Sequence, residues 1–544
     1  MFEFYLIMQK IYFIILFIIF GFLFSVTGCA KRGTITGGLK DTIAPKIVSS
    51  TPKNYNTNFK GNQIKIIFNE LIKVKNINKQ LIISPPLKNS PTIVPQGSAS
   101  KFISIKIQDT LQENTTYSFN FGQSIIDHNE GNPYSQFKYV FSTGSYIDSL
   151  TIVGTIKDAY NQKPDDFVSV LLYDALTYKD STVYKETPLY VTNTLDSLKV
   201  FALENLKEGS YYMIALKDKN GNNKFDPKTD KIGFLREPIS TPSEIAYQLD
   251  LFAEKPAFKA EKPIQQSTNK FFMAYTGSTK DLKVTAQSGL KNIAVFVSQF
   301  PEKDKDSVQL FIPKIENDSI EFFVENNTYS KSFVSKYKEL KETDSLIIRA
   351  KQKGLLNFNE RFTLKLTTPL DKLDISKMKL INNDSVSIDF TTQYHSFEQE
   401  VLFDFKKEES ERYTLELLPG AIIDFYGTTN DTLVQKLNTK AFADYGNLRV
   451  NLKNVNRFPV LVEILNSKGT VLASKTSAKE TVLNFDLIDP LVYTIRLIYD
   501  DNANGEWDTG SFLKKKQAEE IVYFFKEIDV RANWDVDQEF DLNK

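Results

Sequence analysis

Short stretches in which apolar and polar residues alternate dominate the chain after residue 45. The segments QIKIIFNE (63–70), TTYSFNFG (115–122) and RYTLELLP (412–419) are examples, and Asn, Asp, Gly and Pro separate such stretches. Successive strand residues point to opposite faces, so this alternation indicates half-buried β-strands. Turn signals at spacings of about 8–12 residues are typical of β-sandwiches. The sequence therefore predicts an all-β chain of tandem β-sandwich domains.

The length and the charge narrow the class of protein. A chain of 544 residues is expected to form several domains of about 100–200 residues each. The 67 basic and 67 acidic residues balance, so no overall basic charge favours a nucleic acid as partner. Only one segment after residue 45, KSFVSKYKEL at Lys331–Leu340, is a candidate helix, and it is short.

Two internal similarities divide the chain. Residues 200–226 align with residues 482–508 without a gap, which pairs Tyr211 with Tyr493. Such self-similarity at a large spacing indicates a repeated structural unit.

A weaker similarity relates residues 115–144 to residues 411–440. After a one-residue slip, Ile-Asp at 126–127 aligns with Ile-Asp at 423–424. The chain then has the order A–B–x–A–B, in which x is a segment between the two pairs of repeats.

The N-terminus carries the most specific motif. Lys10 precedes an apolar run of 14 residues, Ile11–Phe24, which is shorter than the ~20 residues of a membrane span and suits a signal peptide. The run leads to Val-Thr-Gly-Cys ending at Cys29, which resembles the lipobox of bacterial lipoproteins. That resemblance implies a signal peptide at 1–28 and a lipid on Cys29; the alternative is an uncleaved anchor helix with a chance cysteine. Cys29 is the only cysteine, so no internal disulfide is expected.

The residues after Cys29 bear on where a lipoprotein would reside. Ala30 stands where the inner-membrane retention signal has Asp, and Lys31 and Arg32 follow instead of the acidic cluster of surface-exported lipoproteins. By this resemblance the protein is expected in the outer membrane, on the periplasmic face rather than the cell surface. Residues 29–43 are expected to form a tether.

Residues 44–145 resemble a known domain family. The motifs APKIVSSTPKN, IKIIFNELI, NTTYSFNFG, IIDHNEGN and FKYVFSTG are similar to those of SbsA-type bacterial Ig-like domains. Residues 355–442 resemble the same family more weakly and lack the signature of its first strand.

The second repeat resembles another sandwich. The motifs IVGTIKDA, VSVLLYD and LENLKEGSYYMIALKD are similar to transthyretin-like or carboxypeptidase-regulatory domains, which implies such domains at 150–248 and 446–530. Residues 255–352 are expected to be a β domain of unassigned type. The whole arrangement resembles Ig-like-domain lipoproteins of Bacteroidetes, a resemblance that implies architecture and little biochemistry.

The repeated loop carries oxygen-bearing residues at alternate positions. An EF-type calcium loop supplies side-chain ligands at positions 1, 3, 5 and 9 and a backbone carbonyl at position 7. The matching residues are Asp218, Asn220, Asn222, Lys224 (carbonyl) and Asp226 in the first loop, and Asp500, Asn502, Asn504, Glu506 (carbonyl) and Asp508 in the second. Both loops are therefore candidate Ca²⁺ sites.

A polar turn is the alternative to calcium. Position 12, where an EF loop has a bidentate Glu, is Thr229 in the first loop and Ser511 in the second, and only the first has a substitute at Asp230. Such sites would bind calcium weakly, roughly in the millimolar range, whereas Asn and Asp also cap their own backbone in turns. Phe225 and Trp507 hold the same position in the two loops and are expected to close the sandwich end.

Catalytic motifs are missing from the sequence. His128 and His395 are the only histidines, both expected in exposed polar segments, and no Gly-x-Ser-x-Gly, phosphate-binding loop or usual zinc set is present. Paired acids of a hydrolase remain an alternative that spacing alone does not test.

We therefore expect a protein that is not an enzyme: an outer-membrane lipoprotein acting as a structural or protein-binding scaffold of the cell envelope. The alternative is a surface-exposed adhesin or glycan-binding lipoprotein. The expected partners are the bilayer, through the lipid on Cys29, and envelope proteins, without nucleic acid or a small-molecule substrate.

Overall fold

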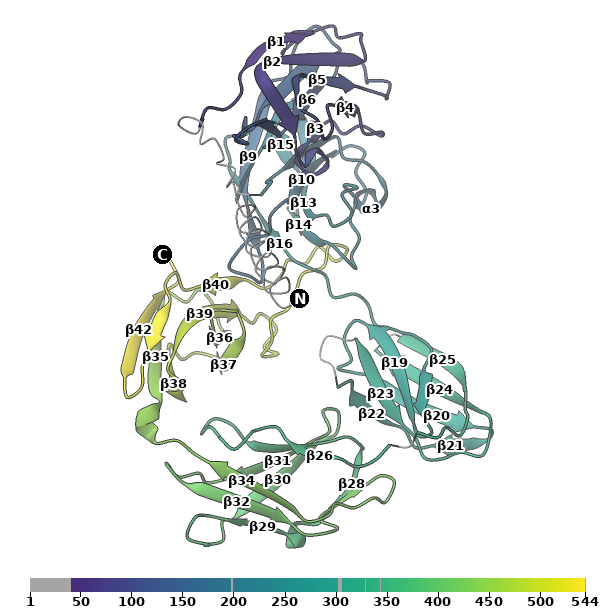
Figure 1. Cartoon of the computed structure of the whole chain (residues 1–544), viewed down its shortest axis with the longest axis vertical. Helices are drawn as coiled ribbons and strands as arrows, with labels where there is room; N and C mark the ends of the chain where they lie inside the picture. The colour runs from purple at the N-terminus through teal and green to yellow at the C-terminus, as the bar shows by residue number, and fades with distance from the viewer. Residues whose placement is uncertain (1–40, 197–198, 302–305, 328, 343, 544) are drawn as a thin grey trace, which may run out of the picture. The chain divides into compact units, whose positions relative to one another are not determined.

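The structure is a computed structural model that describes residues 41–196, 199–301, 306–327, 329–342 and 344–543. The regular secondary structure of this part of the chain is nearly all β-strand (Figure 1), which confirms the predicted all-β class. Its helices are single turns: α2 (Ile77–Gln80), α3 (Thr182–Lys185), and the 3-10 turns η1 (Ile375–Lys377) and η2 (Phe442–Asp444). None of them is long or apolar enough to cross a membrane.

The predicted signal peptide at 1–28, Cys29 and most of the predicted tether lie outside the described residues. The described chain falls into two compact units. The first holds residues 41–81, 88–114 and 119–145, and the second holds residues 82–87, 115–118 and 146–543.

The first unit is built on a five-stranded antiparallel sheet. Its order is β1-β2-β5-β4, and β7 pairs with the far end of β2. The strands of residues 41–145 are β1 (Ile47–Thr51), β2 (Gln63–Val74), β3 (Ile82–Ser84), β4 (Thr92–Val94), β5 (Ser100–Lys106), β6 (Thr116–Asn120), β7 (Ile125–Asp127) and β8 (Lys138–Ser142). Along β2, Ile64, Ile66 and Phe68 are buried and the residues between them are more exposed, as the alternation predicts.

The second unit begins with a sandwich of two sheets, which we call the second sandwich. The sheets have the orders β12-β9-β16, with β16 parallel to β9, and β11-β10-β13-β14, with β15 also paired to β13. The strands are β9 (Leu150–Asp158), β10 (Ser169–Asp174), β11 (Tyr190–Asn193), β12 (Val200–Leu206), β13 (Gly209–Lys217), β14 (Lys231–Phe234), β15 (Ile239–Thr241) and β16 (Tyr247–Leu251). Buried residues such as Phe201, Met213 and Leu249 fill the space between the sheets.

The fifth sandwich, at the C-terminal end of the chain, repeats this topology. Its sheets are β38-β35-β42, with β42 parallel to β35, and β37-β36-β39-β40, with β41 also paired to β39. The strands are β35 (Gly446–Lys453), β36 (Val460–Leu465), β37 (Val471–Ser477), β38 (Val482–Ile488), β39 (Leu491–Tyr499), β40 (Ile521–Tyr523), β41 (Ile528–Val530) and β42 (Asp535–Asp541). The similarity of 200–226 to 482–508 is therefore a structural repeat, and β42 extends the fifth sandwich beyond residue 530.

The fourth sandwich repeats the topology of the first unit. Its sheet β26-β27-β31-β30 has the order of β1-β2-β5-β4, and the pair β28-β33 corresponds to the pairing of β2 with β7; a third sheet is β29-β32-β34. The strands are β26 (Ile348–Ala350), β27 (Phe362–Leu366), β28 (Leu370–Leu373), β29 (Met378–Ile381), β30 (Phe390–His395), β31 (Glu400–Phe405), β32 (Arg412–Leu417), β33 (Ile422–Asp424) and β34 (Leu433–Asn438). The weaker similarity in the sequence is thus structural as well.

The third sandwich has strand orders that differ from those of the two repeated types. Its sheets are β17-β19-β23-β22, with β18 paired to β19, and β21-β20-β24-β25. The strands are β17 (Lys259–Ala260), β18 (Ile264–Ser267), β19 (Lys270–Thr276), β20 (Lys283–Ser288), β21 (Lys291–Ile293), β22 (Phe296–Gln299), β23 (Ser307–Phe311), β24 (Ser319–Asn326) and β25 (Tyr329–Lys336).

The helix predicted at Lys331–Leu340 is wrong, because residues 331–336 belong to β25. That strand pairs with β24 along its whole length, which gives its backbone more hydrogen bonds than a short, marginally stable helix would provide.

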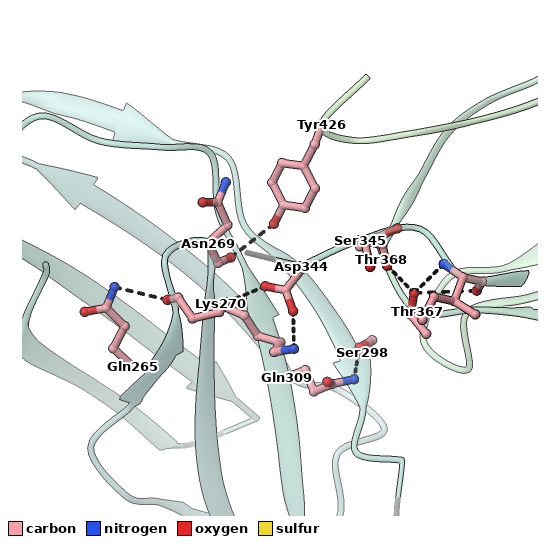
Figure 2. A network of polar contacts seen from close by, with 12 residues as sticks. Gln265, Asn269, Lys270, Ser298, Gln309, Asp344, Ser345, Thr367, Thr368 and Tyr426 are labelled. Atoms are coloured by element: carbon pink, nitrogen blue, oxygen red, sulfur yellow. Dashed lines mark hydrogen bonds and ion pairs between the residues drawn. The ribbon is translucent and has the colours of Figure 1, made fainter. Parts of the chain in front are cut away.

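The junction between the third and fourth sandwiches is filled by polar contacts (Figure 2). The Asp344 carboxylate accepts a hydrogen bond from the Ser267 hydroxyl and pairs with the Lys270 ammonium. The Tyr426 hydroxyl donates to the backbone carbonyls of Asn269, at 3.1 Å, and Ile312, at 3.3 Å. Burial raises the pKa of Tyr426 far above its usual range, so this hydroxyl keeps its proton and remains a donor.

The fourth sandwich is joined to the fifth in a similar way. The Asn359 amide donates to the backbone carbonyls of Asp486 and Leu487 at 2.9 and 3.1 Å. The Tyr445 hydroxyl donates to the Asn357 side-chain oxygen at 3.0 Å. The third and fourth sandwiches, and the fourth and fifth, are therefore connected by specific contacts in addition to the chain itself.

A buried tyrosine closes the same corner in both copies of the repeated sandwich. The Tyr211 hydroxyl donates to the carbonyl of Lys207 at 3.0 Å, and the Tyr493 hydroxyl donates to the carbonyl of Asp489 at 2.6 Å. Burial, reinforced by the negative charge of Asp489, raises the pKa of Tyr493 to about 12. The hydroxyl is therefore a permanent donor at neutral pH.

We predict that Tyr493→Phe destabilises the fifth sandwich by about 1 kcal/mol, because the Asp489 carbonyl loses its donor. Hydrogen exchange of the β39 amides should become correspondingly faster. Tyr146→Phe is the control, because that side chain is 59% exposed and should leave exchange unchanged. Equal exchange in Tyr493→Phe and the wild type would show that this corner contributes nothing.

Candidate functional site

The two Asp/Asn loops occupy equivalent places in the repeated sandwich. The first connects β13 to β14 and the second connects β39 to β40. In each, a long strand through the middle of the larger sheet leads into the loop, and the first Asp of the loop directly follows that strand. Register in the sheet therefore fixes where each loop starts.

The first loop is folded around the carboxylate of Asp218. One oxygen accepts the backbone N–H groups of Asn220 and Gly221 at 3.0 and 2.7 Å, and the other accepts that of Asn223 at 2.6 Å. The Asn222 side-chain oxygen accepts the N–H of Lys224 at 2.8 Å. These are the bonds of an Asx-type turn.

The second loop is folded around Asp500, which is 2% exposed. Its two carboxylate oxygens accept the N–H groups of Asn504 and Gly505 at 3.0 and 2.8 Å. Asp508 accepts hydrogen bonds from the side-chain amides of Asn502 and Asn504. The amide nitrogens of these two asparagines thus face the carboxylate of Asp508.

A further buried carboxylate supports each loop, and sequence reasoning missed one of them. Asp230 accepts the N–H groups of Lys219 and Asp226 at 3.0 and 2.9 Å. In the second loop Glu519 accepts the N–H groups of Asp501 and Asp508 at 2.9 and 2.8 Å.

The repeat alignment pairs Lys219 with Asp501 and Asp226 with Asp508, so Asp230 and Glu519 have the same role. The alignment of the two loops did not identify Glu519, because Glu519 lies eleven residues after Asp508 whereas Asp230 lies four residues after Asp226. Burial and the nearby negative charges of Asp508 and Asp500 raise the pKa of Glu519, and the two backbone donors oppose this shift.

The structure accounts for the Asp and Asn residues of both loops as turn-forming groups. Among the described residues, no group of three or more His, Cys, Asp or Glu side chains is placed to hold a metal ion. The candidate calcium set of two carboxylates, two amides and one carbonyl in each loop stays a prediction. Its acceptors already bind the backbone N–H groups and side-chain amides of their own loop.

The aromatic residues at the shared loop position, Phe225 and Trp507, have different surroundings. Phe225 is 3% exposed and belongs to a buried aromatic cluster. The Trp507 indole N–H donates to the carbonyl of Glu519 at 2.9 Å, and its ring lies 4.8 Å from that of Tyr160. Phe225 is therefore buried on its own sandwich, whereas the half-buried Trp507 lies against Tyr160 of the second sandwich and is not part of the core cluster of the fifth. The expectation that both rings close the end of their own sandwich is thus not met by Trp507.

The histidines are less exposed than the sequence suggested. His128 directly follows β7 and His395 ends β30, and both are half-buried. The Nδ1 atom of His128 is buried. Neither is part of a metal-binding group among the described residues.

We predict that Asp500→Ala destabilises the fifth sandwich by about 1 kcal/mol, because the N–H groups of Asn504 and Gly505 lose their acceptor and the loop loses the bonds that hold it. Because the hydrogen bonds of the turn account for this loss of stability, the loss should be the same in the presence of a chelator as in the presence of millimolar calcium. The measurement is hydrogen exchange in β39 and β40, with Glu506→Ala as the matched control because that exposed carboxylate accepts no loop N–H. A loss that appears only with calcium would establish an ion site instead.

Comparison with known proteins agrees with this architecture. Residues 41–143 match the family model of the bacterial Ig-like domain, which confirms the Ig-like resemblance drawn from the motifs of residues 44–145. None of the curated proteins compared with the chain matches it.

Several solved structures of multidomain proteins are similar over much of the chain. The S-layer protein rSbsC has 13% identity and a TM-score of 0.16, covering 90% of this chain and 67% of its own. The Bacteroides ovatus mixed-linkage glucan utilization locus SGBP-B, in complex with a mixed-linkage heptasaccharide, has 12% identity and a TM-score of 0.17, covering 82% and 99%. BcpA, the major pilin subunit of Bacillus cereus, has 10% identity and a TM-score of 0.14, covering 72% and 99%. At such low TM-scores none of these likenesses bears on the function of this chain.

Proposed function

We propose that the protein is a non-catalytic lipoprotein of the outer membrane that serves as a structural or protein-binding scaffold in the cell envelope. The observation that carries this proposal is that hydrogen bonds connect the fourth sandwich to both of its neighbours. Tyr426 binds the third sandwich and Asn359 binds the fifth. Contacts of this kind hold neighbouring sandwiches in a defined relation. A defined succession of domains suits the presentation of binding surfaces to other proteins.

A hollow on the described part of the second sandwich has little of the character of a catalytic cleft. The hollow has a volume of about 440 Å³ and is lined by residues 146–150 and 206–208. It is open to solvent, and the Asp/Asn loops do not line it. Catalytic and ligand sites are more often enclosed clefts with a few convergent polar groups.

The finer family assignment belongs to the same proposal. The identical strand orders of the second and fifth sandwiches support one domain type for both, which we assign to the transthyretin-like or carboxypeptidase-regulatory class. The first and fourth sandwiches would be SbsA-type Ig-like domains. The proposed origin among Bacteroidetes lipoproteins rests on the motifs and the lipobox-like Val-Thr-Gly-Cys ending at Cys29.

We predict that cells expressing the protein incorporate labelled palmitate into it and that Cys29→Ser abolishes the label, since the thiol would be the acylated group. The wild type should fractionate with the outer membrane and the variant should be released. Ala30→Ser, which keeps the cysteine, is the control. Equal labelling of Cys29→Ser would exclude lipidation at this residue.

We predict that protease added to intact cells leaves the protein uncut, because the proposed location is the periplasmic face. Lysed cells provide the control, in which the linkers between sandwiches become accessible. Cleavage on intact cells would place the protein on the surface and favour the adhesin or glycan-binding alternative.

Cross-linking in intact envelopes followed by pulldown identifies the bound protein, and a preparation that contains only glycan would contradict the scaffold.

A further inference from the structure

The loop between β39 and β40 differs from its counterpart in the second sandwich by an insertion. Asp230 and Glu519 support equivalent backbone positions, yet Glu519 follows the last shared aspartate by eleven residues and Asp230 by four. The fifth sandwich therefore carries seven additional residues before Glu519. The shared turn is preserved, so the insertion has a separate role.

The insertion places Phe512 against the outer face of the larger sheet of the second sandwich. Phe512 is 1% exposed and belongs to a cluster formed otherwise mainly by residues of the second sandwich. Its ring centroid lies 5.3 Å from that of Phe234, 6.2 Å from Tyr184 and 6.5 Å from Phe225. Edge-to-face pairs at such distances are favourable for aromatic rings.

Polar contacts hold the backbone on both sides of this ring. The Thr509 hydroxyl donates to the carbonyl of Ala253 at 2.6 Å, and the N–H of Phe512 donates to the Glu254 carboxylate at 2.5 Å. Farther along the insertion, the Gln517 amide donates to the carbonyl of Phe234 at 2.8 Å.

An ion pair and a tightly packed glycine complete this contact. Lys515 pairs with Asp180 at 2.6 Å. At Gly510, an added Cβ would lie 2.5 Å from the Phe252 ring and 2.7 Å from the carbonyl of Lys516. The insertion is therefore shaped closely to the second sandwich and has no room for a larger side chain at this position.

A second contact lies around Tyr160 of the second sandwich. The Arg496 guanidinium lies 4.3 Å from the Tyr160 ring centroid and donates to its hydroxyl at 2.8 Å. The Tyr523 hydroxyl donates to the Tyr160 carbonyl at 2.7 Å. Arg496 also pairs with Glu463 of the fifth sandwich, which helps to hold the guanidinium at this contact.

We infer that residues 509–517, which contain the insertion, are a clasp: an intramolecular recognition element by which the fifth sandwich binds the second. The clasp combines an aromatic anchor with hydrogen bonds to fixed backbone carbonyls, which is how hot spots of protein interfaces are built. Because the two sandwiches belong to one chain, a high effective concentration favours the closed state. The clasp joins the two ends of the segment that contains the third and fourth sandwiches, and it does not depend on the proposed location or function.

The test cuts the covalent connection and asks whether the contact persists. A specific protease site is inserted in the full chain between Pro256 and Ala257, two exposed residues between the second and third sandwiches. After complete cleavage, we expect the pieces that end at 256 and begin at 257 to co-elute in size-exclusion chromatography at micromolar concentration. Native mass spectrometry should show one copy of each piece.

Variants identify the residues responsible. Phe512→Ala should weaken association of the cleaved pieces at least about tenfold, as expected for loss of a buried aromatic anchor. Leu513→Ala is the matched control, because the adjacent side chain is 62% exposed and should not change association. Tyr160→Ala tests the contact from the second sandwich without altering the clasp itself.

The outcomes are distinct. Wild-type pieces that separate at micromolar concentration, or Phe512→Ala pieces that stay together as tightly as the wild type, would overturn the clasp. An uncleaved chain that is dimeric, with the dimer lost in both Phe512→Ala and Tyr160→Ala, would overturn the intramolecular assignment and place the contact between two copies. Circular dichroism of each uncleaved variant checks the fold, and Gln517→Ala, which removes the clasp's donor to the Phe234 carbonyl, decides the matter if Phe512→Ala does not fold.

Discussion

Buried carboxylates that accept backbone N–H groups shape the loops of this chain. Asp127 accepts three of them, from Glu130, Gly131 and Asn132. Burial alone would raise the pKa of Asp127, yet these bonds outweigh it and lower the pKa. Asp500 and Glu519 bind loop N–H groups in the same manner. Loops held in this way are fixed enough to carry specific contacts, because each buried carboxylate binds two or more backbone N–H groups of its loop at once.

The repeated sandwiches keep their sheets and differ in these loops. In the first unit the loop after Asp127 begins with His128, whereas the aligned loop after Asp424 contains Phe425 and Tyr426. The Phe425 ring lies 4.6 Å from Phe296 of the third sandwich, and Tyr426 binds two of its carbonyls. In the repeat formed by the second and fifth sandwiches, Phe512 of the inserted segment likewise contacts another sandwich, the second. In both cases the later copy uses an aromatic loop residue to contact another sandwich of the chain.

The strands and the repeats were accessible from the sequence because they depend on local pattern. Alternation along β2 and the ungapped match of Tyr211 with Tyr493 report side-chain direction and spacing, which a folded sheet preserves. The segment at 331–340 was predicted wrongly because its weak local preference was overridden by pairing with β24, a contact made by another part of the chain. Glu519 was missed because a seven-residue insertion moved it out of the aligned position.

The sequence by itself determined the β class, the two kinds of repeat, the repeated Asp/Asn loops and the distinctive Cys29 motif, because each depends on neighbours along the chain. Only the tertiary structure decided that Phe512 enters a cluster more than 250 residues earlier in the sequence, near Phe225 and Phe234. An apolar residue in a polar loop looks the same whether it meets solvent or another domain. The difference lies in the aromatic surface that the other domain supplies, and that surface exists only after both sandwiches have folded.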